Sequence, residues 1–382
     1  MLINESHFTQ KWSIVNLDEV VEFLDSQRKP ITEKDRISGT YPYYGANGQQ
    51  DLINDYIFDE PLVLLAEDGG HFGEPNRTIA YQINGKCWVN NHAHVLRPKN
   101  NINIRYLCRV LEHYDVSKYI TGSTRAKLTK TSASQIKIPL PPIASQRRIA
   151  NILDKADEII RKRKEAIALT EQLQKSIFLD MFGDPVTNPK GWEKVTVNDV
   201  VSEVKDGPHV SPEYSHNGIP ILSTRNIRPN ELIMEDIKYI SEDVYLNLIK
   251  RFKPQKGDVL LTKGGTTGFA KVVDWDWNFA VWVHLALLRP NNKIRSEFLE
   301  ATLNSPNCYL QSQLYTHGIA NKDLGLNRIR KIKMCLPPLD LQDEYCQIRK
   351  KTLFLLNKNK KSLKESENLF NSLLQKAFKG EL

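Results

Sequence analysis

The chain contains one sequence pattern twice. The segment IKIPLPPIASQRRIANILDKADEI begins at Ile136, and the related segment IKMCLPPLDLQDEYCQIRKKTLFL begins at Ile332. Three further landmarks recur in the same order: Trp12 and Trp192, LVLLAEDGG at 62–70 and DVLLTKGG at 258–265, and HAHVLRPKN at 92–100 and HLALLRPNN at 284–292. A pattern repeated over this much of a chain predicts two similar halves, at roughly 1–184 and 185–382.

The loops between these landmarks differ. YPYYGANG at 41–48 lies where the second half has IPILSTRN at 219–226. Loops vary more than the elements they connect, and they carry binding functions more often. A common scaffold with two different sets of loops is typical of a chain whose two halves keep the same geometry but bind different targets.

Each copy of the repeat continues into a long amphipathic helix. Apolar residues recur at spacings of three and four from 146 to 181, with charged residues between them, and a similar stripe runs from about 341 to 378. Pro142 and Gly183 flank the first stretch, where helices begin and end. Roughly 35 residues of helix extend about 50 Å, which exceeds an ordinary domain helix.

A single apolar stripe on so long a helix needs a partner, and the other copy is the most economical one. If the helices hold the globular portions apart, they must run antiparallel. We expect an irregular two-helix coiled coil, because Arg163 and Thr170 interrupt the stripe. The alternative is that each helix packs on its own domain or pairs with another chain.

The rest of the sequence predicts α+β globular portions. Short β-rich runs alternate with Gly, Pro and Asn, and one short helix is expected at 104–112, with its counterpart at 296–303. The predicted fold is therefore α+β, with two similar domains at 1–140 and 185–338. Long helices at 141–184 and 339–382 separate them as an antiparallel coiled coil, and the internal repeat has pseudo-two-fold character.

Composition narrows the class of protein. A chain of 382 residues can bury substantial cores, and a net charge of +8 with a pI near 9.0 favours a polyanionic partner. The five cysteines are scattered without a close CxxC pair, so we expect buried thiols and no disulfide framework or zinc site. The first residues lack a signal-peptide pattern, and no run of about 18 apolar residues occurs. We expect a soluble, cytoplasmic protein.

Polar residues in the loops are candidates for contacts with nucleic acid. Arg and Lys donate to guanine edges, Asn recognises adenine, and Ser and Thr hold phosphates. Each of these residue types is also common in solvated turns. The candidates in the first half are Tyr43, Tyr44, Asn47, His71, Asn90, Asn91, Ser123, Thr124, Arg125 and Lys127, and those in the second half are Thr224, Arg225, Asn226, Lys263, Thr266, Thr267, His317, Asn321 and Lys322.

Motifs of common enzyme sites do not occur. KGGTTG at 263–268 lacks the spacing of a phosphate-binding loop, so its glycines predict a tight turn after a strand. The patterns G-x-G-x-x-G, H-E-x-x-H and G-x-S-x-G are missing from the sequence. We therefore expect no catalytic, cofactor or metal site in the chain itself.

Taken together, these features resemble the specificity subunit of type I restriction-modification enzymes. The resemblance rests on the IKIPLPP and IKMCLPP stretches, IFLDMFGDP at the end of the first helix, the GDVLLTKGGTTG turn, the two LRP tripeptides and the terminal LLQKAFKGEL. It covers nearly the full length. One departure is Cys335, which stands where the first copy has Pro139.

The resemblance implies two target-recognition domains, each recognising one half of a split sequence in double-stranded DNA. Such a subunit has no chemistry of its own. It recruits two modification subunits, which bind S-adenosylmethionine and methylate adenine, and restriction subunits, which translocate and cut DNA. A helical pair of about 50 Å can hold two recognition domains roughly one DNA turn, about 34 Å, apart.

Other interpretations stay open at this stage. The chain could be a structural adaptor whose globular ends bind protein, or an enzyme that uses His92 and His284 at mirrored positions. The basic stretches from Arg349 to Lys364 and from Arg161 to Lys164 could face spacer phosphates, solvent or a partner.

Overall fold

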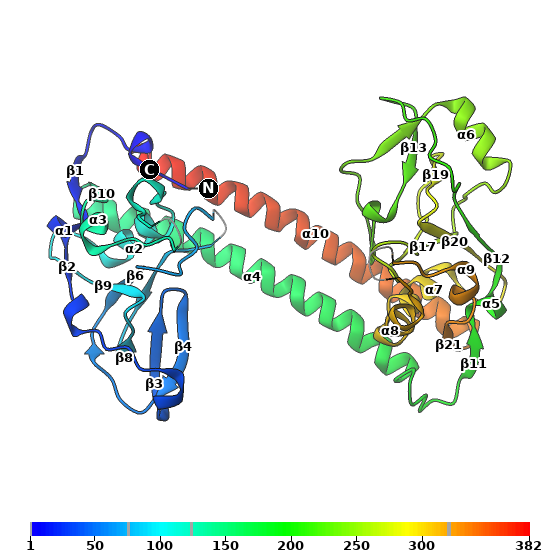
Figure 1. Cartoon of the computed structure of the whole chain (residues 1–382), viewed down its shortest axis with the longest axis horizontal. Helices are drawn as coiled ribbons and strands as arrows, with labels where there is room; N and C mark the ends of the chain where they lie inside the picture. The colour runs from blue at the N-terminus through cyan, green and yellow to red at the C-terminus, as the bar shows by residue number, and fades with distance from the viewer. Residues whose placement is uncertain (1, 75–76, 123–124, 319–321) are drawn as a thin grey trace. The chain divides into compact units, whose positions relative to one another are not determined.

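The computed structural model describes residues 2–74, 77–122, 125–318 and 322–382. The chain forms two compact units (Figure 1): the first comprises 1–165 with 360–382, and the second comprises 166–359. Each unit contains the start of one long helix and the end of the other. The boundary between the compact units therefore lies within both long helices.

The described residues of the first unit form two four-stranded sheets and one small two-stranded sheet. Their strand orders are β2-β9-β6-β7, β4-β3-β8-β5 and β1-β10. Within these sheets, β3 pairs with β8 in a parallel manner, and the other strand pairs are antiparallel. The elements are η1 (Glu5–His7), β1 (Ser13–Asn16), α1 (Leu17–Val20), β2 (Val21–Phe23), η2 (Asp25–Gln27), η3 (Glu33–Asp35), β3 (Ser38–Gly45), β4 (Gly48–Ile53), β5 (Phe58–Asp59), β6 (Leu62–Ala66), β7 (Ala80–Ile83), β8 (Lys86–Val89), β9 (Ala93–Pro98), α2 (Ile104–Glu112), η4 (Ser117–Tyr119), α3 (Lys130–Ser134), β10 (Lys137–Leu140) and the start of α4 (Ile143–Phe182).

The second unit has the corresponding sheets with different additions. The strand orders are β12-β20-β17-β18, β16-β13-β19, β14-β15 and β11-β21. The elements after α4 are β11 (Glu193–Thr196), α5 (Val197–Val200), β12 (Val201–Asp206), β13 (Ile219–Leu222), η5 (Thr224–Asn226), β14 (Ile227–Arg228), β15 (Glu231–Leu232), β16 (Lys238–Ile240), α6 (Glu242–Ile249), β17 (Val259–Thr262), β18 (Ala270–Val272), β19 (Ala280–Val281), β20 (Leu285–Pro290), α7 (Ser296–Leu303), α8 (Pro306–Tyr315), α9 (Leu326–Ile329), β21 (Lys333–Leu336) and the start of α10 (Leu339–Phe378).

The repeat predicted from the sequence is confirmed by these topologies. The sheet β2-β9-β6-β7 has the same connectivity as β12-β20-β17-β18, and the pair β1-β10 corresponds to β11-β21. The expected short helices are α2 and α7, with the predicted bounds. The other large sheet differs between the units, in agreement with the dissimilar sequences at 41–48 and 219–226.

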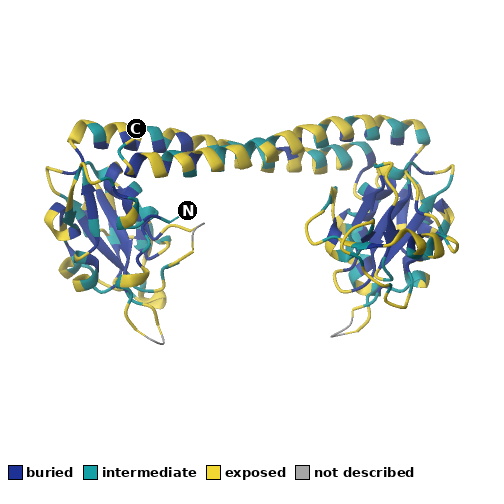
Figure 2. Cartoon of the chain, turned by 90° about the horizontal axis from the view of Figure 1, so that it is seen from above, coloured by how far each residue is buried: buried dark blue, intermediate teal, exposed yellow. Residues whose placement is uncertain are grey.

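The central strand of each repeated sheet is buried on both faces, which explains its continuous apolar sequence. Along β6, Val63 and Leu65 pack in one core with α2, whereas Leu62 and Leu64 pack in a second core on the other face. This alternation follows from the two-residue period of a strand. Figure 2 shows the result in each unit: the strands are buried, and the loops at their ends are exposed.

Both long helices span 40 residues. α4 starts after Pro142, and it ends before Gly183, whose φ of +76° is the left-handed conformation that glycine adopts most easily at a helix end. No helix among the described residues is both long and apolar enough to cross a membrane.

The helices pair in an antiparallel manner within each unit, so the predicted coiled coil is confirmed. In the first unit the Arg163 Nε donates to the Ser366 Oγ at 3.2 Å. In the second unit the Gln174 Nε2 donates to the Thr352 Oγ1 at 3.1 Å, and the Phe182 ring lies 5.2 Å from that of Tyr345. Polar contacts in the seam agree with the expected irregular packing. The alternative that each helix packs separately on its own domain is wrong.

Candidate nucleic-acid interface

In the first unit, three loops meet at the turn that follows β6. Asp68 accepts hydrogen bonds there from the His92 Nδ1 at 2.5 Å and from the Arg125 Nη2 at 3.0 Å. The Asn47 side chain donates to the carbonyl of Gly69 at 2.9 Å. The loops around 47, 68–70, 91–92 and 125 therefore form one continuous surface.

Below this surface lies the first triad, which we define as Arg28, Glu67 and Lys127. The Glu67 carboxylate pairs with the Arg28 Nη1 at 2.7 Å and with the Lys127 Nζ at 2.9 Å. Burial alone would raise the pKa of Glu67, but the hydrogen bonds from Lys127 and Arg28 hold that pKa below its ordinary value. Glu67 is therefore ionised and doubly paired.

The buried His94 lies between Asp25, Glu67 of the first triad, and Leu128, the residue that follows Lys127. The His94 Nε2 lies 2.7 Å from the carbonyl oxygen of Leu128, which can only accept, and the Nδ1 lies 2.6 Å from the Asp25 Oδ2. The side chains of Asp25, Glu67 and His94 offer possible metal-ligand atoms that all lie within 4.8 Å of one another. Their carboxylates, however, already pair with basic side chains, so the cluster is better described as an ion-pair network than as a metal site.

In the second unit, the turn after β17 has a similar construction. The second triad consists of Asp206, Lys263 and Asp323. The Lys263 Nζ lies 3.4 Å from the Asp206 Oδ2 and 3.3 Å from the Asp323 Oδ1. The amide of Gly265 donates to the carbonyl of Lys322 at 3.0 Å. This contact brings the turn at 264–266 next to the loop ends at 317 and 322.

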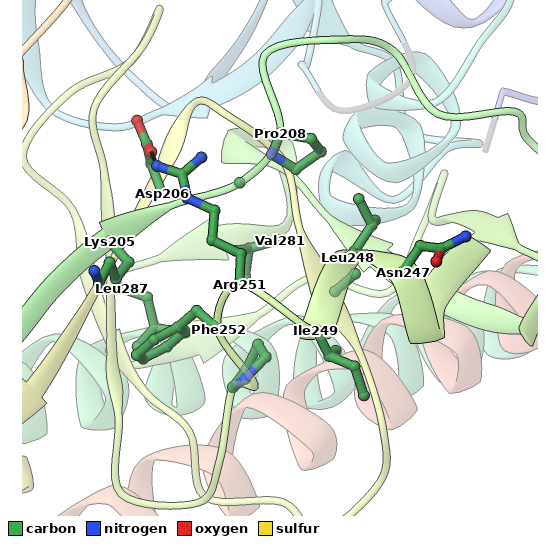
Figure 3. A pocket seen from close by; sticks show the side chains of 13 residues that line it. Lys205, Asp206, Pro208, Asn247, Leu248, Ile249, Arg251, Phe252, Val281 and Leu287 are labelled. Carbon is green, nitrogen blue, oxygen red and sulfur yellow. Dashed lines mark ion pairs between the residues drawn. The ribbon is translucent and has the colours of Figure 1, made fainter. Parts of the chain in front are cut away.

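Each unit also has a small hollow next to these loops. In the second unit a hollow of about 210 Å³ lies beside Asp206, with apolar walls that include Phe252 and Val281. Figure 3 shows Arg251 directed toward Asp206, and the Arg251 Nη2 lies 3.7 Å from the Asp206 Oδ1. In the first unit a hollow of about 300 Å³ is bordered by Asn91 and His92. Ligand pockets usually start at about 300 Å³, so the hollow of the second unit is smaller than that range and the hollow of the first unit lies at its lower limit.

The candidate residues that the structure describes fall into three groups by exposure. The exposed ones are Asn47, Asn91, Arg125, Arg225, Thr266, His317 and Lys322, and the partly exposed ones are Tyr44, His71, Lys127 and Thr224. The buried ones are Tyr43, Asn90, Asn226, Lys263 and Thr267. Ser123, Thr124 and Asn321 lie outside the described residues.

The buried candidates have partners within their own unit. The Tyr43 hydroxyl accepts from the amide of Ile31 at 3.0 Å. Asn90 and Asn226 bind nearby backbone groups, and the Thr267 hydroxyl lies 2.9 Å from that of Thr316. These side chains shape the loops and do not face solvent.

Arg349, which opened one of the two basic stretches, is also buried. Its Nη2 pairs with the Glu300 Oε2 at 2.6 Å and with the Asn230 Oδ1 at 2.6 Å. Arg349 is therefore not available for spacer phosphates. The two histidines at mirrored positions also have different neighbours. The His92 ring contacts Asp68. The His284 ring instead lies against Gly264, so close that a Cβ at that position would collide with it.

Sequence reasoning missed the charged residues that organise both sites, of which Asp206 is buried and the others are partly exposed. Arg28, Asp68, Asp206 and Asp323 were not candidates, because a charged residue in a loop gives no sign of its partner. A pair of glutamines was missed as well. The Gln146 Oε1 accepts from the amide of Asn103 at 2.7 Å, and the Gln342 Oε1 accepts from the amide of Arg295 at 2.8 Å.

These glutamines attach the start of each long helix to its domain. Gln146 also donates to the carbonyls of Asn101 and Pro141, and Gln342 donates to those of Lys293 and Pro337. The signal for them was present in the sequence, because both occupy the same place in the repeat that begins at Ile136 and Ile332.

Comparison with known proteins agrees with this architecture. The family model "Type I restriction modification DNA specificity domain" matches residues 9–169 and again 189–369. A putative type I restriction enzyme specificity subunit of Haemophilus influenzae is 28% identical over 363 residues, which are 89% of this chain and 87% of the relative. The EcoKI specificity subunit of Escherichia coli is 24% identical over 84% of this chain and 74% of its own.

A solved structure has the same fold. The S subunit of a type I restriction-modification system from M. genitalium superimposes with a TM-score of 0.67 at 14% identity, over 99% of this chain and 98% of that one. The two matches to the family model together cover most of the sequence and coincide with the two copies of the repeat. The chain therefore belongs to the type I restriction modification DNA specificity domain family.

Proposed function

We propose that the chain is the non-catalytic specificity subunit of a type I restriction-modification complex, and that each half recognises one part of a bipartite DNA sequence. The observation that carries the proposal is the pair of equivalent loop surfaces with different residues. One surface presents Asn47, Asn91 and Arg125, and the other presents Thr266, His317 and Lys322. Different donors and acceptors thus surround the equivalent turns after β6 and β17, as recognition of two different half-sites requires.

The chemistry of these side chains suits duplex DNA. Asn can bond to adenine and Arg to guanine in the major groove, whereas Thr and Lys suit phosphate contacts. The proposed contact set is Tyr44, Asn47, His71, Asn91 and Arg125 in the first half, and Thr224, Arg225, Thr266, His317 and Lys322 in the second. Ser123, Thr124 and Asn321 remain predictions from the sequence.

The long helices are the proposed docking site for two modification subunits. Ile159 and Leu355 occupy the same position counted from the start of their helices, and their exposed fractions are 47% and 45%. Leu173 and Leu369 are a second such pair, with exposed fractions of 48% and 55%. Each unit thus contains one residue of each pair. Two equivalent apolar surfaces favour two copies of one partner.

The remaining roles in this proposal follow from the complex. The modification subunits bind S-adenosylmethionine and methylate adenine, restriction subunits join them, and the helices set the length of the spacer between half-sites. A role on chromosomal DNA implies a cytoplasmic location. The absence of a motif for methyl transfer or nuclease chemistry in the sequence is compatible with this division of labour.

The test is to map adenine methylation in cells that produce the full chain with its modification partner. We expect one motif with two specified parts and a spacer of fixed length. Arg125→Ala should relax one part only, and Arg225→Ala should relax the other part only. A single continuous motif, or no methylation together with no capture of the complex by duplex DNA at moderate salt, would contradict the proposal and favour the adaptor interpretation.

A further inference from the structure

Glu67 and Lys263 occupy equivalent places in the two units but carry opposite charges. Glu67 follows β6, and Lys263 follows the equivalent strand after Thr262. The amide of Leu128 donates to the carbonyl of Glu67 at 2.7 Å, and the amide of Leu324 donates to the carbonyl of Lys263 at 2.7 Å. The backbone geometry is thus the same at both places.

The residues at the ends of the neighbouring loops are equivalent too. Lys127 exchanges two backbone hydrogen bonds with Thr121, at 2.8 and 2.9 Å. Asp323 exchanges the same two bonds with His317, at 3.0 and 2.8 Å. These bonds join the two ends of each loop. The next residue, Leu128 or Leu324, provides the amide that donates to the carbonyl of Glu67 or Lys263.

The charges in the two triads are reversed as a set. In the first triad a buried anion, Glu67, lies between two cations, and in the second a buried cation, Lys263, lies between two anions. The exposed fractions of these central residues are 9% and 6%. A charge this well shielded from water interacts strongly with its neighbours, and a like charge beside it is destabilising.

Neither loop end is therefore compatible with the central residue of the other unit. An aspartate at 127 would put two carboxylates together, and a lysine at 323 would put two ammonium groups together. The backbone alone does not discriminate between the two loops, because its hydrogen bonds are the same in both units.

We propose that Glu67 and Lys263 are positioning residues for DNA recognition. Each holds the adjacent loop of its own half, which ends at Lys127 or Asp323, by attraction between opposite charges. The inference rests on the proposed function, because it assigns the ion pairs Glu67–Lys127 and Lys263–Asp323 a role in specificity. Each pair holds the base of a loop that carries a proposed contact: Arg125 in the first half, and His317 and Lys322 in the second.

The experiment uses the full chain with its modification partner and measures methylation rates on plasmids that carry the mapped target or single-base variants of it. Lys127→Asp should lower discrimination in one half of the target by at least about tenfold and leave the other half unchanged. Asp323→Lys should do the reverse, so each variant is the control for the other. Asp323→Glu, which keeps the charge, should retain discrimination.

Rescue separates a specific ion pair from general damage. Removing the central charge relieves the repulsion, so Glu67→Gln with Lys127→Asp should discriminate better than Lys127→Asp alone. Lys263→Gln with Asp323→Lys should likewise improve on Asp323→Lys. Loss of discrimination in both halves at once, or double variants no better than the single ones, would overturn the inference.

Melting temperatures of the purified full chain make the two proposals distinguishable. If the wild-type complex methylates no bipartite motif, the proposed function fails. The same rescue should still appear in the melting temperatures if the ion pairs form, and additive losses there would refute the pairs themselves.

Discussion

Replacing Gln146 by alanine tests how the first long helix is attached to its domain. Gln146 is 1% exposed, and its side chain makes three hydrogen bonds to backbone groups of Asn103, Asn101 and Pro141. Alanine leaves one N–H and two carbonyl groups without these partners in a buried place. At roughly 1 kcal/mol for each bond, we expect a loss of about 3 kcal/mol in the free energy of unfolding of the first unit.

Urea denaturation and thermal melting of the full chain measure this loss. A unit of this size loses roughly 2–4 °C in Tm per kcal/mol, so the transition of the first unit should fall by about 6–12 °C. Hydrogen exchange gives a local readout, because the amide of Asn103 loses its acceptor and should exchange faster. Gln146→Glu should do no better than alanine, since a carboxylate cannot donate to the two carbonyls.

The matched control is Arg147→Ala, one residue further along the same helix at an exposed position. Exposed substitutions of this kind usually change stability by less than about 0.5 kcal/mol. If Gln146→Ala and Arg147→Ala have equal effects, or if the amide of Asn103 exchanges at an unchanged rate, the assigned role of Gln146 is wrong. Gln342→Ala should lower the transition of the second unit instead.

Three further results are expected. Burial and the nearby Arg109 charge lower the pKa of His113 from 6.5 to about 4. The contribution of the neutral His113 to stability is therefore present above pH 6.5 and is lost as the pH falls toward 4. In urea titrations at pH 5, His113→Phe should reduce the acid-induced loss of stability of the first unit by about 2 kcal/mol. Arg349→Met leaves the Glu300 carboxylate buried without its cation and should cost about 3–5 kcal/mol by denaturation, whereas Arg349→Met with Glu300→Leu should recover most of that loss. Leu173→Asp should reduce the number of bound modification subunits from two to one in native mass spectrometry without a change in melting temperature, and a loss of both subunits would contradict two separate docking surfaces.

The features that depend on local periodicity were predictable from the sequence. The two long helices, the short helices α2 and α7 and the repeated sheet follow from apolar spacing and from the recurrence of landmarks. These patterns lie within the sequence of a single element, or they recur in the other half of the chain. Tertiary contacts reinforce them, so the prediction and the structure agree closely at the element bounds.

The environment of individual polar residues was less predictable. Tyr43, Asn226 and Lys263 have the residue types of solvated loops, yet each is buried with a partner. Asn226 accepts from the amide of Ser223 within the η5 turn, so its role is to stabilise that turn. Arg349 begins a basic stretch of the sequence, but it lies on the buried side of α10 next to Glu300. Burial of this kind depends on which elements pack together, and a single segment does not contain that information.

An internal repeat nevertheless adds a source of tertiary information that a single sequence usually lacks. Glu67 and Lys263 are separated by the same number of residues as Lys127 and Asp323, so the two positions of one pair align with the two positions of the other. Both positions change sign between the copies, and a paired change of sign is what direct contact between charged residues demands. The distances of 2.9 and 3.3 Å agree with that inference. Comparing the halves residue by residue therefore predicts the contact between positions 67 and 127, although 60 residues of chain separate them. The third member of each triad escapes this comparison, because Arg28 and Asp206 are not at equivalent positions and reach the central charge from different parts of the scaffold.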